Sequence, residues 1–143
     1  MTTWDRDKVA ASKNNLEGAE LKGLDLSGLN LNKANLISAI MVSANLRDIS
    51  LVGANLFSVK AMRADFSGAN LSGVNFLKAN LTNANLTKSN LNDADLTGAN
   101  LFNADLEKTD LIRAKLVEAN LLGANLSGAV SYTHLTLPTT PYV

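Results

Sequence analysis

Residues 79–98 read Ala79-Asn-Leu-Thr-Asn, Ala84-Asn-Leu-Thr-Lys, Ser89-Asn-Leu-Asn-Asp and Ala94-Asp-Leu-Thr-Gly, which is one five-residue pattern in four successive copies. The spacing extends in both directions, from Leu16 to 126, without an insertion or a deletion. Internal repetition of this kind determines an architecture more strongly than any local propensity. The repeat is therefore the starting point for the fold.

Two positions of the repeat are restricted to apolar residues. The central position occurs 23 times and is Leu in nineteen of them; the others are Met41, Ala61, Phe66 and Phe76. The second position lies two residues before the next central one and is Ala in sixteen of 23 copies. Between the two stands a residue that is mostly Asn or Asp. Both apolar positions are predicted to point inward.

A period of five fits neither an α-helix, which needs apolar residues at a spacing of 3.6, nor a long strand, which alternates by two. A chain that turns a corner every five residues keeps each Leu inside. Each face then contains a very short strand, and the second inward residue is small because the two side chains share a narrow interior. Asn, Asp and Gly suit such corners, since they tolerate unusual backbone angles.

The run Ala-(Asn/Asp)-Leu-x-x resembles the pentapeptide repeat family over residues 15–130. The resemblance implies an all-β fold, a right-handed parallel β-helix with four faces per coil of twenty residues. On that reading the chain forms about six coils and a rod on the order of 27 Å long, at the usual strand spacing. The rare central residues support a coil of twenty, because Ala61, Phe66 and Phe76 all fall within residues 61–80, where one small side chain can compensate two large ones.

Both ends depart from the repeat. Residues 1–14 are predicted to form a short helical N-terminal cap, with Thr3 as N-cap and with Trp4 and Val9 covering the first coil. Residues 131–143 contain both prolines, both tyrosines and the only histidine, His134. This tail resembles translated adapter sequence; the alternative is a genuine extended cap or partner-binding strand.

Composition excludes several classes of chemistry. Thirteen Lys and Arg balance thirteen Asp and Glu, so the basic footprint of a nucleic-acid binder is missing. There is no cysteine, and the repeats contain no histidine, which leaves no nucleophile–base pair and no ligand cluster for a metal. No apolar stretch is long enough for a membrane span, and no secretory signal is visible. We expect a cytoplasmic protein that is not an enzyme and that uses no cofactor, metal, small-molecule substrate, nucleic acid or membrane.

Three acids, Asp25, Asp65 and Asp105, are spaced by multiples of twenty and are predicted to share one face. At two coils apart they fit a solvated stripe better than an acid–base pair. A second reading is that of the gyrase-protecting members of the family, which mimic DNA with an acidic surface. The mixed charges of this chain argue against that reading, and an enzyme or cofactor binder is a more remote alternative.

The residue after each central one is predicted to point outward. Grouping these residues at intervals of twenty, one from each coil, gives four columns. The first column runs from Glu17 to Val117, the second from Lys22 to Leu122, the third from Ser27 to Ser127 and the fourth from Asn32 to Ile112. The third is wholly polar, whereas eight of the twelve residues in the first two are large and apolar. We call these eight the apolar patch: Ile37, Val42, Phe57, Met62, Leu77, Phe102, Val117 and Leu122. A contiguous patch predicts an interaction site for an unknown protein partner or for a second copy of the chain.

Overall fold

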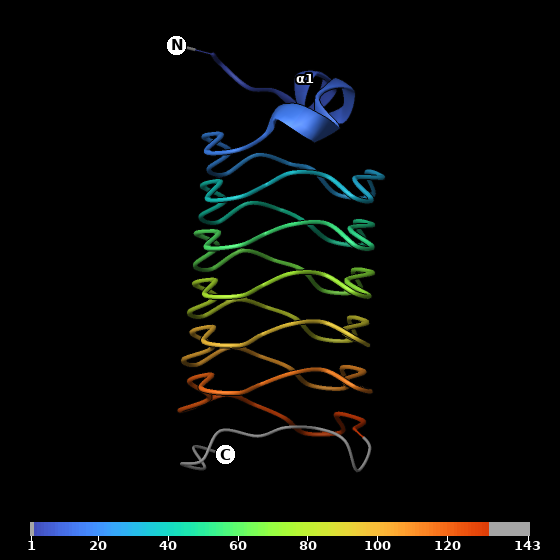
Figure 1. The fold of residues 1–143 in the computed structure, drawn as a ribbon, viewed down its shortest axis with the longest axis vertical. Coiled ribbons are helices and arrows are strands. Elements are labelled where there is room, and N and C mark those ends of the chain that lie inside the picture. Colours follow the sequence, from blue (N-terminus) through green and yellow to red (C-terminus); the bar gives the residue numbers. More distant parts are fainter. Residues whose placement is uncertain (1, 132–143) are drawn as a thin grey trace.

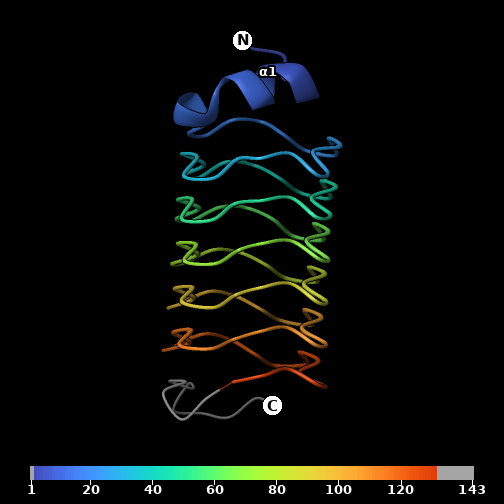
Figure 2. The same cartoon turned by 90° about the vertical axis from the view of Figure 1, so that its right-hand side faces the viewer.

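The computed structural model describes residues 2–131, and these form a stack of similar coils with a short helix, α1, over one end (Figures 1 and 2). The coils follow the sequence in order along the long axis, so residues far apart in the stack are also far apart in the chain. Of the predicted tail, only Ser131 is among the described residues; the rest, including His134, lies outside them.

Pairing between coils has a constant register of twenty residues. The first parallel bridge joins Glu20 to Ile40 and the last joins Asp110 to Val130, with one bridge at every fifth residue between them. The paired residue is always the one before the central position. Within residues 2–131 each face is so short that no strand longer than this single bridge forms. The predicted coil of twenty residues with four faces is therefore confirmed as the register of the fold.

A tight turn follows every central residue. The central carbonyl accepts a hydrogen bond from the N–H three residues later, as from Ala84 to Leu81 at 3.0 Å. The residue two after the central one has a positive φ, between 54° and 74°, in every repeat from Gly18 to Gly128. This is the geometry of a type II turn, in which glycine is favoured at that position. The predicted corners are thus confirmed, although fourteen of them carry a residue other than glycine.

Backbone hydrogen bonds join each coil to the next along all four faces. On the second face, Leu21 N–H donates to the Ile40 carbonyl at 2.7 Å, and Ile40 N–H donates to the Ala19 carbonyl at 2.8 Å. The turn residue Gly23 donates to the Val42 carbonyl at 3.0 Å. Because these bonds recur in each repeat, the backbone groups that point from one coil to the next are satisfied while only side chains fill the core.

The core contains the two predicted inward positions. Every central residue from Leu16 to Leu121 is buried, as are most of the small residues at the second position. Phe66 and Phe76 project from facing sides and meet edge to face, with ring centroids 5.7 Å apart and an interplanar angle of 82°. Ala61 is buried in the same coil, so its small side chain leaves the room that the two rings need.

The N-terminal segment covers the first coil, but its helix begins two residues later than predicted. Helix α1 spans Arg6–Ala11, and a 3-10 turn, η1, follows at Lys13–Asn15. The N-cap is Asp5, whose carboxylate accepts the Lys8 N–H at 2.8 Å, so the prediction of Thr3 as N-cap is wrong. A carboxylate at this place also interacts favourably with the positive end of the helix dipole, which a threonine hydroxyl does not. Val9 is buried against the core and Trp4 is partly buried there, as predicted.

Candidate protein-interaction surface

The apolar patch lies on the outside of two adjacent faces, at the first corner residue of each turn. Members of one column that are twenty residues apart stand directly above one another at the strand spacing of about 4.8 Å, and Thr97 and Thr82 interrupt the first and second columns. Val117 and Leu122 are 38% and 49% exposed, whereas the other six, including Phe57 and Phe102, are half-buried. The prediction that the two phenylalanines face solvent is therefore only partly right. Whether the patch is an interface stays a prediction.

Side-chain amides hold most of these corners in place. In the usual repeat, the side-chain oxygen of the Asn or Asp before the central residue accepts a hydrogen bond from the backbone N–H of the residue after the central one. Asn55 accepts from Phe57 at 3.1 Å, and Asn100 accepts from Phe102 at 3.0 Å. This bond, which we call the Asx brace, satisfies a donor that the turn itself leaves open. The frequency of Asn and Asp in the repeat thus has a structural cause.

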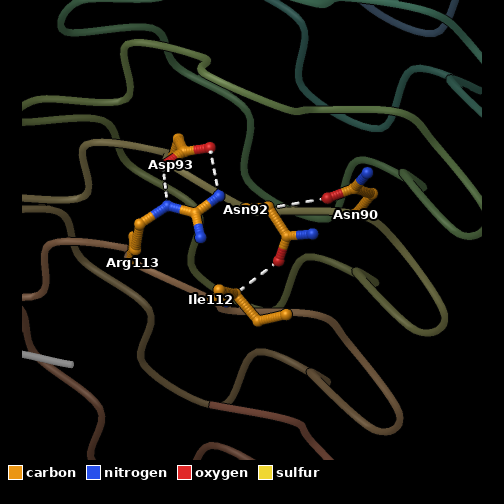
Figure 3. Close-up of polar contacts among 5 residues, drawn as sticks. All are labelled: Asn90, Asn92, Asp93, Ile112 and Arg113. Carbon is orange, nitrogen blue, oxygen red and sulfur yellow. Dashed lines mark hydrogen bonds and ion pairs between the residues drawn. The ribbon is translucent and has the colours of Figure 1, made fainter. Parts of the chain in front are cut away.

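On the fourth face the brace can also come from the preceding coil. Figure 3 shows Asn92, whose own N–H donates to Asn90 and whose side-chain oxygen accepts the N–H of Ile112 at 2.9 Å. Asn32 does the same for Val52 at 2.9 Å. These two contacts compensate for repeats in which the usual acceptor is absent or turned away.

Three successive corners of the second face lack any brace. The residues before the central position there are Glu20, Ile40 and Lys60 in place of Asn or Asp. Within residues 2–131, the backbone N–H groups of Lys22, Val42 and Met62 have no hydrogen-bond acceptor. We call these three N–H groups the donor row. Because the coils are in register, the row runs parallel to the rod axis at about 4.8 Å per step.

Ile40 also extends the apolar patch, and the sequence reasoning missed it. It is paired between Glu20 and Lys60, lies between the first and second columns, and is half-buried. The signal was available, since Ile40 is a large apolar residue at a position that elsewhere is mostly Asn or Asp. At intervals of twenty residues, that position holds Glu20, Ile40 and Lys60, which a coil of twenty brings together.

Charge is distributed unevenly around the rod. Four stacked segments carry the middle of the patch: 37–43, 57–63, 77–83 and 97–103. They contain Lys60, Arg63 and Lys78, all exposed, and no Asp or Glu. The ion pair found in residues 2–131 lies elsewhere, on the fourth face, where Arg113 donates to Asp93 at 2.6 Å (Figure 3). The three cations of the patch therefore have no carboxylate within ion-pair distance in the described part of the chain.

The acids that share a face accept hydrogen bonds from backbone N–H groups of the turns. Asp25, Asp65 and Asp105 alternate with asparagines along the third face and act as Asx braces, as from Ser67 N–H to Asp65 at 2.9 Å. Asn45 also donates to Asp25 at 3.1 Å. The Ser27 hydroxyl and then its backbone N–H hold the pKa of Asp25 below its usual range. These contacts fit a polar stripe on the surface better than an acid–base pair.

The described part of the chain offers little for other kinds of site. Residues 2–131 hold no group of three His, Cys, Asp or Glu side chains placed to bind a metal ion. None of their helices has the length and apolar character that crossing a membrane requires. The third face has a shallow polar hollow lined by, among others, Arg47, Asp65, Thr87 and Lys88.

Comparisons with known proteins support the fold. The pentapeptide repeat profile matches eight copies, over residues 15–51, 64–101 and 94–130. A pentapeptide repeat protein from the thylakoid lumen of Arabidopsis thaliana is similar, with 33% identity, 68% of each chain covered and a TM-score of 0.67. The protein Rfr23 of the cyanobacterium Cyanothece 51142 has 24% identity over 84% of this chain and 88% of its own, with a TM-score of 0.48.

A third solved structure, that of the plasmid-mediated fluoroquinolone resistance protein QnrB1, has 20% identity over 85% of this chain and 86% of its own. Its TM-score is 0.30. The comparison with curated proteins finds no match. The profile covers more than half of the chain, and the periodic core, turns and register agree with it. The chain therefore belongs to the pentapeptide repeat family, whose fold is a right-handed β-helix.

Proposed function

We propose that this protein is a non-enzymatic interaction module, a rod that presents the apolar patch to a protein partner. The observation that carries the proposal is the concentration of large apolar residues in two adjacent columns, beside a third column that is wholly polar. Single exposed apolar residues are ordinary on a soluble protein, whereas a contiguous patch costs solubility and is typical of interaction sites.

Rigidity suits the rod to this role. The bonds between coils recur at each face, and Asx braces fix the corners that display Phe57, Leu77 and Phe102. Side chains on such a framework lose little freedom when a partner binds, so less of the binding free energy is lost to ordering. Aromatic residues held in this way are effective anchors of an interface.

The arrangement of charge does not favour the gyrase-protecting alternative. DNA mimicry requires rows of carboxylates, and the outward corners nearest the patch carry Lys60, Arg63 and Lys78 instead. The likeness to QnrB1 is confined to the repeat fold and carries no functional argument. A cytoplasmic location stays a prediction from the sequence.

A pair of substitutions tests the proposal. Phe57→Glu together with Phe102→Glu should abolish partner capture in affinity purification from the source cells, with the partner then purified and its Kd measured. Because both rings are half-buried, we expect a cost of about 0.5–1 kcal/mol each in the free energy of unfolding, with the circular dichroism spectrum unchanged.

The matched control is Ser67→Glu with Thr87→Glu, on the polar third column, which should leave capture and stability unchanged. If the phenylalanine variant folds and every association is retained, the patch is not the interface and the proposed function fails. Unfolding of that variant alone would instead place the two rings in the core.

A further inference from the structure

The donor row and the cations beside it suggest what the partner brings to this surface. Val42 and Met62 combine an apolar side chain with an open backbone N–H, and Lys22 adds a third donor in the same line. Unsatisfied donors are tolerated in water but cost free energy when an interface covers them, unless the partner supplies acceptors. A partner that covers this part of the patch must therefore carry oxygen atoms along one line.

The unpaired cations point to the charge of those acceptors. Lys60 is the neighbour of Ile40 in the parallel pairing, and Arg63 follows Met62 directly. Lys78 lies one coil further on, next to Leu77. N–H groups and cations together favour carboxylates, because hydrogen bonds to a charged acceptor are about twice as strong as neutral ones.

A second copy of the chain does not fit. A two-fold interface places the same patch on both subunits. With the rods parallel, Lys60 and Arg63 meet their own equivalents. With the rods antiparallel about the middle of the patch, they meet Lys78 at the centre, and an end segment with two acids and one cation, Glu17, Glu20 and Lys22, meets Glu118. Both arrangements oppose like charges, which costs several kcal/mol of specificity in an interface.

An anionic membrane fits less well than a peptide. Lipid recognition by charge alone uses clusters of about four to eight Lys or Arg. Here the stacked segments from 17–23 to 117–123 carry four cations, Lys22, Lys60, Arg63 and Lys78, but also three acids, Glu17, Glu20 and Glu118, so this side of the rod is nearly neutral. The donor row moreover presents its N–H groups at a fixed spacing, which suits acceptors held in register by a polypeptide.

We propose that the donor row, with Ile40, Lys60 and Arg63 around it, binds an acidic apolar segment of a partner protein, whose Asp or Glu side chains accept the open N–H groups while its apolar residues pack on Val42 and Met62. This inference rests on the proposed function and names the chemistry of the partner. It differs from an acidic, DNA-mimicking surface in sign, since here the acids belong to the partner.

The decisive variants restore the brace that the face lacks. Ile40→Asn and Lys60→Asn are each expected to accept the corner N–H, as Asn80 accepts that of Thr82 at 3.1 Å. The double variant should fold with equal or greater stability, since it makes the repeat more regular. It should nonetheless lose binding, because two of the three donors are then occupied and one cation is gone.

The probe is a displayed library of random twelve-residue peptides, selected on the purified protein and then synthesised. Enriched peptides should contain apolar residues flanked by Asp or Glu, above the library average. Their Kd should rise by about tenfold or more in the Ile40→Asn, Lys60→Asn double variant and in Lys60→Glu with Arg63→Glu. Lys88→Glu with Lys108→Glu, on the third face, is the matched charge control and should leave the Kd unchanged.

Several results would overturn the inference: no enrichment, enrichment of neutral or basic peptides, or a Kd that the double variant leaves unchanged. A membrane would be the partner instead if the protein bound vesicles rich in phosphatidylglycerol, if the same variants lost that binding, and if no peptide bound. Capture that depends on Phe57 and Phe102 but not on the donor row would refute this inference and leave the proposed function standing.

Discussion

The contact between Phe66 and Phe76 allows a quantitative test of how the core is packed. Both side chains are fully buried, and their rings meet edge to face at 5.7 Å. Replacing either ring by Leu, the residue found at most central positions, removes apolar surface and should cost about 1–2 kcal/mol. The ring pair adds its own attraction of about 0.5–1.5 kcal/mol, which the first substitution already removes.

The double variant should therefore be less destabilised than the sum of the two single ones, by that same amount. Urea unfolding, followed by circular dichroism for the four members of the cycle, measures the difference. Additivity to within about 0.3 kcal/mol would show that the rings occupy separate spaces. In that case the explanation of the small Ala61 in the same coil, as room left for two touching rings, is wrong.

Three further predictions follow from the core, the turns and the ion pair. Leu91→Asn places an amide in a fully buried site and should cost about 3–5 kcal/mol, lowering the Tm of the whole rod; a Tm equal to that of the parent would show that Leu91 is not inward. Ser58→Gly relieves a φ of 54° and should raise the free energy of unfolding by up to about 1 kcal/mol, whereas a loss would show that the corner is not strained. Arg113 lowers the pKa of Asp93, so the stabilisation by this carboxylate is present above its usual pKa of about 3.9 and is lost as the pH falls through the lower folded value. The urea midpoints of the parent and of Asp93→Asn should accordingly differ more at pH 7 than at pH 2, and an equal difference at both would exclude this linkage.

The inward half of the structure could be predicted because it depends on volume and spacing alone. A Leu at every fifth residue stays inside only if the chain turns once in each repeat. The coil of twenty came from the resemblance to the family, and Phe66 and Phe76, which share a coil with Ala61, supported it. The corners followed for the same reason, since Gly68 and its equivalents recur in phase with the core.

What could not be predicted depends on competition between equivalent local contacts. Thr3 and Asp5 are both good N-caps, and the helix uses Asp5, whose carboxylate accepts the Lys8 N–H. The half-burial of Phe57 could not be read from a single repeat, because the equivalent residues of the adjoining coils, Ile37 and Leu77, are twenty residues away in the chain. The donor row could not be predicted, because Ile40 and Lys60 differ from the repeat only by one side chain each. The structure shows that an Asn at that position accepts the corner N–H, as Asn80 does.

Each coil of twenty residues contains four repeats of five, and this has a consequence for how such a surface can change. Removing one pentapeptide from the middle of the rod keeps every later Leu inward, so the core is preserved. It also moves every later residue to the neighbouring face, so that Phe102 and Leu122, for instance, would leave the line of Val42 and Met62. Deleting a full coil would instead shorten the rod and keep each surface line intact. A lineage of such proteins can therefore reshuffle its outer surface by slippage in units of fifteen nucleotides, with its interior hardly affected.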